Sequence, residues 1–178
     1  WVRALERAGL GVWDWDVEAD TCYYSPGWAK MLGYEPGELP ADPDLWVTLT
    51  HPDDLDAAIA SGERHMAGQS ERIETEMRLR HKDGRWIWVL DRGGIVERNA
   101  AGEPSRLLGV QTDITRRKGA EDRLVQLNAR FRLALEASGT GIWQHDVATK
   151  RTFWDGRTHE IFGLPAIPGE VATRRWQS

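Results

Sequence analysis

The sequence contains a single cysteine, Cys22, among 178 residues. One thiol cannot form an internal disulfide, so the disulfide-stabilised folds of small secreted proteins are excluded. A lone thiol fits a reducing compartment, and we expect a cytoplasmic location. No apolar run approaches the roughly 20 residues that a membrane-spanning helix needs, and no signal peptide is visible. A membrane anchor elsewhere in a longer protein stays open.

The sequence also lacks an excess of positive charge. Lys and Arg total 23 against 28 Asp and Glu, which gives a net charge of −5 and a pI near 5.6. A surface that binds the phosphates of nucleic acids needs clustered basic residues. We therefore expect no nucleic-acid partner.

Catalytic motifs are missing too. The sequence has no Gly-x-Ser-x-Gly elbow, no phosphate-binding Gly-Lys-Ser/Thr loop and no paired metal-ligand motif. His51, Asp53 and Asp54 come nearest to a metal cluster, but neighbouring positions on one helical turn point in different directions. Capping and the helix dipole account for both aspartates. We expect no metal site and no enzymatic activity here, so any catalytic effector domain lies outside this chain.

Tryptophan, by contrast, is abundant, with ten residues. Four of them form two Trp-x-Trp pairs, Trp13 with Trp15 and Trp86 with Trp88. Bulky aromatics at a spacing of two are typical of strands that repeat a large side chain on one face.

The sequence also repeats itself. The segment from Leu5 to Trp13 returns from Leu135 to Trp143, and the same offset of 130 residues carries Gly33 onto Gly163. No gap is needed over some forty residues, so the pattern indicates one module followed by the start of a second copy. We expect the chain to be a piece of a longer tandem array, cut inside its second repeat.

The first half of the leading repeat reads as short elements. We expect a strand over 11–17, a strand over 21–25, a helix from Pro26 to about Leu32, a loop over 35–44 and a helix from Pro52 to about His65. Ser25 is a good N-cap with Pro26 at the first helical position, and Gly33 suits a left-handed helix end.

Three longer strands follow, over 73–79, 85–96 and 106–114, with a tight turn at 82–84 and a helix from Thr115 onward. Glu74, Glu76, Arg78 and Arg80 alternate with apolar residues, which predicts one charged face with cross-strand ion pairs. This order of elements predicts an α+β fold, a five-stranded antiparallel sheet with short helices on one face, followed by a long linker helix.

Four short motifs occur in order along this repeat: Leu32-Gly33-Tyr34, His51-Pro52-Asp53-Asp54, Arg80-His81-Lys82-Asp83-Gly84, and Gly109-Val110-Gln111-Thr112-Asp113-Ile114-Thr115. In this order and spacing they resemble the PAS sensory domains that carry a C-terminal PAC motif. The resemblance covers residues 1–118 and again 131–178. It implies a PAS-PAC domain over 1–115, a helical signalling linker over 116–134 and a truncated second PAS domain over 135–178.

The resemblance also implies where a ligand would bind. Six residues are expected to line the cavity between sheet and helices: Trp28, Met77, Leu79, Ile87, Val89 and Gln111. Trp86, Trp88 and Leu90 then lie on the outer face, where a helix, the linker or a second subunit would have to cover them. Both faces of this strand are apolar, so periodicity alone leaves the reverse orientation open.

Two cofactors known from the family are poorly supported here. His65 lies in the general region of the heme-ligating histidine of some PAS domains, but it follows Glu63-Arg64 near a helix end and is expected to be solvated. Flavin-binding members share the Gly109-Val110-Gln111 run, yet the segment that would carry their reactive cysteine has none. Cys22 reads as a small buried apolar residue in a strand. The cofactor is left unknown.

The exit from the domain carries the signal-relay candidates. In PAS proteins the run from Asp113 to Lys118 joins the last strand to an output helix, and we assign Asp113, Thr115 and Arg117 to this contact. Further along, apolar residues recur at spacings of three and four, at Leu124, Leu127 and Phe131. This seam fits either a parallel dimer or packing on the chain's own domain. With Trp86 and Trp88, it forms the candidate dimer interface.

Taken with the resemblance, these features predict a sensory module of a multidomain bacterial signalling protein, such as a sensor histidine kinase or a diguanylate cyclase. It would detect a small molecule or a partner and act through its linker helix on a C-terminal effector domain, as a homodimer. Two alternatives remain: a ligand-free dimerisation scaffold, and a heme- or flavin-based redox sensor.

Overall fold

The computed structural model describes residues 5, 7, 9–165 and 169–172. They fall into two compact units, one within Trp1–Ala120 and one within Glu121–Ser178. No helix in the described ranges is both long and apolar enough to cross a bilayer.

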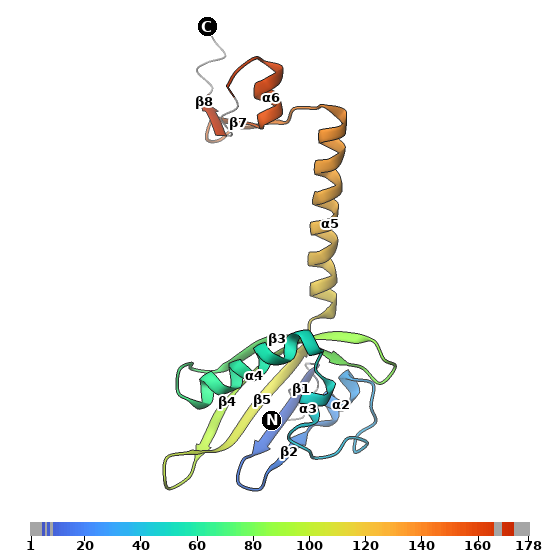
Figure 1. The fold of residues 1–178 in the computed structure, drawn as a ribbon, viewed down its shortest axis with the longest axis vertical. Helices are drawn as coiled ribbons and strands as arrows, with labels where there is room; N and C mark the ends of the chain where they lie inside the picture. The colour runs from blue at the N-terminus through green and yellow to red at the C-terminus, as the bar shows by residue number, and fades with distance from the viewer. Residues whose placement is uncertain (1–4, 6, 8, 166–168, 173–178) are drawn as a thin grey trace. The chain divides into compact units, whose positions relative to one another are not determined.

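The first unit is built on a five-stranded antiparallel sheet (Figure 1). Its strands are β1 (Leu10–Asp16), β2 (Thr21–Tyr24), β3 (Ile73–Arg80), β4 (Trp86–Arg98) and β5 (Pro104–Asp113). They lie in the order β2-β1-β5-β4-β3, so β5, the last of the five along the chain, occupies the middle of the sheet. The predicted α+β class and five-stranded sheet are confirmed.

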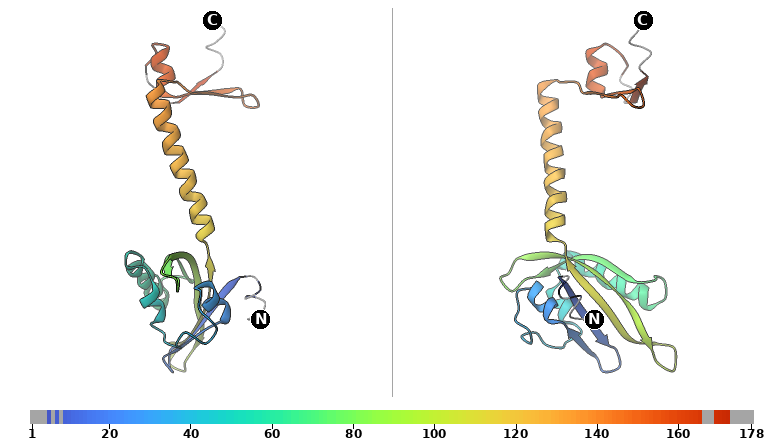
Figure 2. Two further views of the ribbon diagram at one scale, coloured as in Figure 1. Left: turned by 90° about the vertical axis from the view of Figure 1, so that its right-hand side faces the viewer. Right: turned by 180° about the vertical axis from the view of Figure 1, so that it is seen from behind.

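Three helices pack on one face of this sheet: α2 (Pro26–Met31), α3 (Leu45–Leu49) and α4 (Pro52–Met66) (Figures 1 and 2). Helix α2 begins as predicted, because the Ser25 hydroxyl accepts a hydrogen bond from the Trp28 N–H at 3.2 Å. Helix α3 was not predicted from the sequence. Asp44 stands at its N-cap position but makes no side-chain capping bond, and the helix is only one turn long.

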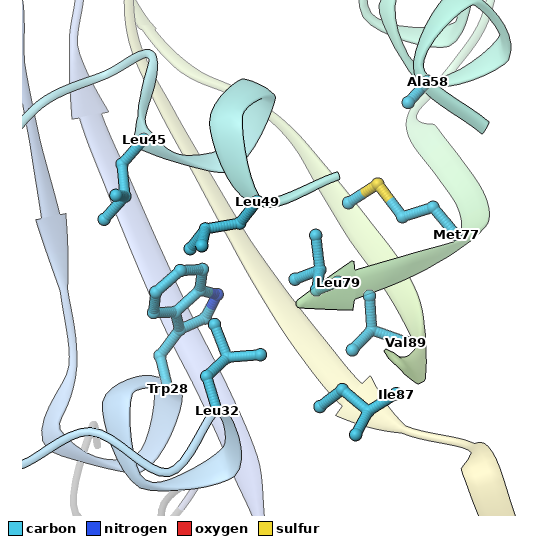
Figure 3. Close-up of a cluster of buried hydrophobic side chains, with 9 residues drawn as sticks. All are labelled: Trp28, Leu32, Leu45, Leu49, Ala58, Met77, Leu79, Ile87 and Val89. Atoms are coloured by element: carbon cyan, nitrogen blue, oxygen red, sulfur yellow. The ribbon is translucent and has the colours of Figure 1, made fainter. Parts of the chain in front are cut away.

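The core of the first unit lies between the helices and the sheet (Figure 3). Side chains from all three helical segments meet the inner face of β3 and β4: Trp28, Leu32, Leu45, Leu49 and Ala58 pack with Met77, Leu79, Ile87 and Val89. Ile87 and Val89 are buried, whereas Trp86 is 39 % exposed. Strand β4 therefore has its tryptophans on the outer face, the orientation that the resemblance implied.

Two glycines shape the inner face of the sheet beside this core. Gly93 of β4 and Gly109 of β5 are register partners, and Gly109 is also the partner of Trp13 on β1. A Cβ atom on either glycine would lie within 2.4 Å of the Trp13 ring. The missing side chains therefore leave the space in which the Trp13 indole lies.

The second unit repeats the local structure of the first. Its sheet, in the order β6-β7-β8, consists of β6 (Trp143–Asp146), β7 (Arg151–Trp154) and β8 (Gly169–Ala172). Strand β7 and helix α6 (Gly156–Ile161) lie 130 residues after β2 and α2, with the same lengths. Asp155 caps α6 by accepting from the Thr158 N–H at 2.8 Å, as Ser25 caps α2. Strand β8 was not predicted.

Helix α5 (Thr115–Ser138) follows β5 directly, as predicted. It contains the whole segment 116–134 that we expected to be the linker. The domain boundaries drawn from the sequence remain predictions.

Candidate functional site

A cavity of about 290 Å³ lies between α4 and the inner face of the sheet. This volume is at the small end of the range for ligand sites, which is roughly 300–1,000 Å³. Its walls are mostly apolar and rich in aromatic rings, contributed by Trp13, Trp15, Tyr24 and Trp46. The cavity therefore suits a small ligand with substantial apolar surface.

A chain of hydrogen bonds crosses the floor of this cavity. The Trp28 indole N–H donates to Gln111 Oε1 at 2.8 Å, and the Trp13 indole N–H donates to Asp91 Oδ1 at 2.7 Å. Gln111 and Asp91 are register partners on β5 and β4, and their side chains are hydrogen-bonded to each other. Since Gln111 Oε1 accepts from Trp28, its NH₂ group is the donor to Asp91.

Asp91 is the unusual member of this chain. Its side chain is buried, with 9 % exposure, and no described Lys, Arg or His forms an ion pair with it. Burial raises the pKa of the Asp91 carboxyl to about 6, and the hydrogen bonds from Trp13 and Gln111 oppose that rise only in part. The carboxyl therefore changes between its neutral and its charged form near pH 6.

A second polar group in the same wall is incompletely satisfied. The Trp15 indole N–H is buried and has no hydrogen-bond partner among the residues that the structure describes. A buried donor left in this state costs about 1–3 kcal/mol. Among the described residues, this wall therefore supplies no acceptor for the Trp15 N–H.

The predicted ligand-binding residues divide into two groups. Met77 and Gln111 line the cavity, and Trp28 holds Gln111 from behind. Leu79, Ile87 and Val89 lie in the packed core beside it, at 0, 3 and 0 % exposure (Figure 3). The binding role of all six stays a prediction, and alternation along a strand predicts which face a side chain takes but not how closely it is covered.

Sequence reasoning missed the residues that give the cavity its character, Trp13, Trp15 and Asp91. Trp13 and Trp15 share one face of β1 because they are two positions apart. Asp91 lies on the same face of β4 as Ile87 and Val89, at even spacing from both. The sequence signal that could have identified Asp91 was an acidic residue on an otherwise apolar face of the strand.

His65 is not solvated, contrary to our expectation. It is 7 % exposed; Nδ1 lies 2.9 Å from the Ser70 carbonyl oxygen, and Nε2 accepts from the Ile95 N–H at 3.0 Å. The ring links the end of α4 to the following loop and to β4. Both nitrogens are engaged, so His65 has no lone pair left for a heme iron.

The residues around His51 also hold elements together. His51 Nδ1 accepts from the Asp53 N–H at 3.2 Å, which caps α4. The guanidinium of Arg78 on β3 donates two hydrogen bonds to the Asp54 carboxylate, at 2.7 and 2.8 Å, and these bonds lower the pKa of Asp54. Within the described ranges, no group of three or more His, Cys, Asp or Glu side chains is arranged to hold a metal ion.

The start of α5 is tied to two strands. The Thr115 N–H donates to Asp113 Oδ1 at 2.8 Å, and Thr115 Oγ1 accepts from the Trp88 N–H at 3.0 Å. The Ile114 N–H donates to the Trp88 carbonyl at 2.8 Å. Asp113 and Thr115 thus sit where the relay prediction needs them, although the role itself stays a prediction.

Charged contacts add to this hold. Glu76 of β3 pairs with Lys118, at 2.5 Å, and with Arg117, and hydrogen bonds from these two residues lower the pKa of Glu76. Lys118 and Arg78 also lie over the Trp88 ring, at 4.9 and 5.2 Å from its centroid. Trp88 is therefore covered largely by cations of its own chain, which leaves Trp86 as the more open residue of the pair.

The predicted helical seam is exposed. Leu124, Leu127 and Phe131 are 60, 64 and 56 % exposed, and no residue of α5 is buried within the described structure.

Comparison with known proteins assigns the family. The family model for the PAS fold matches residues 21–111, just over half of the chain. The chain belongs to the PAS family. A solved PAS-containing relative, a sensory box histidine kinase/response regulator from Burkholderia thailandensis, is 34 % identical with a TM-score of 0.64, over 74 % of this chain and 96 % of that one.

Curated relatives of this PAS chain are much longer signalling proteins. The probable diguanylate cyclase DgcE of Escherichia coli is 28 % identical over 163 residues, which is 92 % of this chain and 14 % of the relative. The two-component sensor PprA of Pseudomonas aeruginosa is 31 % identical over 119 residues, 65 % of this chain and 12 % of the relative. The chain spans about one seventh or less of their length.

Proposed function

We propose that this PAS domain is a sensory module of a multidomain bacterial signal-transduction protein of the histidine kinase or diguanylate cyclase type. It binds a small molecule in the cavity and passes the change to helix α5. Catalysis belongs to an effector domain outside this chain, and the module works in the cytoplasm. Similarity to DgcE and PprA supports the class of protein.

One observation carries the relay. The cavity floor and the anchor of α5 lie on the same two strands: Asp91 is three residues from Trp88 on β4, and Gln111 is two residues from Asp113 on β5. At about 3.3 Å per residue, roughly 7–10 Å of strand separates these two cavity residues from the residues that anchor α5. A ligand that changes the hydrogen bonds of Asp91 or Gln111 therefore acts on strands that hold the start of α5.

Helix α5 then passes the structural change to a second copy of the chain. Leu124, Leu127 and Phe131 form an exposed seam with the spacing of a two-stranded coiled coil. A ligand shifts this assembly only through its different affinity for two arrangements of the anchor. The exposed seam also supports a second candidate function, dimerisation that needs no ligand.

Native mass spectrometry of the purified chain separates the two candidates. A sensory module retains or accepts a small molecule, and Gln111→Leu weakens that binding because it removes the amide at the cavity floor. The variant also leaves the Trp28 N–H without an acceptor, at about 1–3 kcal/mol, so near-ultraviolet circular dichroism must show that it is folded. Ligand affinity unchanged in a folded Gln111→Leu protein contradicts the proposed site.

A further inference from the structure

The charges around the cavity are all of one sign. Among the residues that line it, Asp91 and Glu63 are acidic, and there is no Lys, Arg or His. Cys22 and Tyr24 also line it, and burial raises the pKa of both groups, so they are neutral near pH 7. The charged side chains of this lining would repel an anionic ligand.

Asp91 lacks the partner that a buried carboxylate normally has. Elsewhere in the first unit, less buried acids pair with cations of the same chain, as Asp54 does with Arg78 and Asp14 with Arg106. Asp91 has two neutral donors, the Trp13 indole and the Gln111 amide. Buried charges are normally paired, since neutral hydrogen bonds replace only part of the lost hydration.

The aromatic walls suit the same kind of missing partner. Trp13, Trp15, Tyr24 and Trp46 bring electron-rich rings to a space whose lining is otherwise mostly apolar. Ring faces attract cations, and the attraction is stronger where water is excluded. An aromatic enclosure with one buried carboxylate complements an organic ammonium group better than a neutral or anionic one.

We propose that the cavity binds a small organic ammonium compound whose protonated nitrogen pairs with the Asp91 carboxylate. The inference rests on the proposed function, because it takes this cavity as the ligand site. The apolar part of the ligand lies against the rings and the side chains of Met66 and Met77. The ammonium N–H groups donate to the Asp91 carboxylate, beside the bond that it already accepts from Trp13.

Two series of compounds matched in shape test the charge preference. Phenethylamine, phenethyl alcohol and phenylacetate form one series, and butylamine, butanol and butyrate the other. Isothermal titration of the whole chain at pH 7.5 should give binding of at least one amine, about tenfold or more tighter than its alcohol, and none of either acid. The proposal is overturned if neither amine binds at millimolar concentration, or if an alcohol or acid binds as tightly as its amine.

The variant Asp91→Asn keeps an oxygen for the Trp13 N–H and removes the charge. It should lower the affinity for the amine about tenfold or more while leaving the alcohol unaffected. Glu74→Gln, which removes one negative charge from the exposed edge of β3, serves as the control for net charge and should bind the amine as the native chain does. Equal amine affinity in Asp91→Asn and the native chain would sink the proposal.

The pH dependence of the native chain gives a second test that needs no variant. Asp91 shares the cavity with Cys22 and Tyr24 from β2 and Glu63 from α4. Burial raises the pKa of the Asp91 carboxyl to about 6, so amine affinity should fall about tenfold from pH 7.5 to pH 5 as this carboxyl becomes neutral. Amine affinity that stays level or rises over that range argues against Asp91 as the counter-ion.

Failure here and failure of the proposed function look different. A neutral or acidic metabolite retained in the cavity, and lost in Gln111→Leu, would overturn the ammonium assignment and leave the sensory function standing. A chain that binds no small molecule of any charge would contradict both.

Discussion

Asp91 lies on the inner face of β4, where the preceding inward residues, Ile87 and Val89, are apolar. Alternation along the strand predicts an inward-pointing side chain for Asp91, just as it does for Ile87. Sequence does not reveal how deeply it is buried, because its cover comes from Trp13 and Gln111 on other strands. The same holds for His65: the two residues before it, Glu63 and Arg64, are charged, whereas its hydrogen-bond partners, Ser70 and Ile95, come from other segments.

The buried Asp91 should make stability depend on pH in a recognisable way. Its pKa is raised in the folded state to about 6, whereas an unfolded Asp titrates near 4. The folded chain therefore holds this proton more tightly, and the associated stability is full below pH 4 and lost as pH rises through 6. Relative to Asp91→Asn, the native chain should lose about 2–3 kcal/mol between pH 4 and pH 7.5.

Urea unfolding of both proteins at the two pH values measures this difference. Other acids, such as Glu76 and Asp54, are common to both chains and cancel in the comparison. A difference in unfolding free energy that is equal at pH 4 and pH 7.5 would show that Asp91 is not held in this buried state.

At the scale of the element, the best-predicted features were those with local causes. Ser25 and Pro26 start α2, and Gly33 follows it in the left-handed conformation, with φ of 78°. Helix α3 and strand β8 escaped prediction because both are short and form against other elements, α3 on the core and β8 beside β7. The cavity belongs to the same class, since it forms between elements.

The glycine pair on β4 and β5 links element geometry to the cavity. In Gly109→Ala the new methyl group would lie about 2.3 Å from the Trp13 ring and displace it from Asp91. Overpacking of this kind costs about 1–3 kcal/mol, so the variant should unfold at lower urea concentration. Gly62→Ala in α4, where the added carbon meets nothing within 4 Å, should be neutral or stabilising.

Urea midpoints of the two alanine variants decide this point. If Gly109→Ala were as stable as Gly62→Ala, the position of Trp13 would not depend on the space left by the glycine, and the account of the cavity floor would need revision.

At the scale of the whole molecule, the sequence repeat is also a structural repeat. Gly141 approaches Thr158 in the second unit as Gly11 approaches Trp28 in the first, with 2.8 Å from the added Cβ to the neighbouring Cα in each. The local geometry is thus the same, although the residue at this position is Trp28 in the first unit and Thr158 in the second. The offset of 130 residues predicted this local geometry, whereas for the association of two chains the sequence offers only candidate surfaces, the α5 seam and the outer face with Trp86 and Trp88.

The seam predicts how that association fails. Replacing Leu124 and Leu127 together by Ser removes apolar burial of roughly 1.5–3 kcal/mol per leucine, so a dimer held by α5 should dissociate. Sedimentation would report monomer mass, with the near-ultraviolet signal of the first unit unchanged. Val125→Ser, an equally exposed position off the seam, should leave the dimer intact. A dimer that survives the double substitution would place the interface elsewhere, most simply at Trp86.

The central claim is that occupancy of the cavity changes the hold of β4 and β5 on the start of α5. Hydrogen exchange at the Trp88 and Thr115 amides, with and without the bound ligand, tests it directly. We predict that ligand changes protection at both amides in the native chain. In Thr115→Val, which removes the acceptor for the Trp88 N–H, the ligand should still bind, with an affinity changed by the coupling between cavity and anchor, while its effect on α5 is lost. Ligand binding that leaves the exchange of both amides unchanged in the native chain would contradict the account.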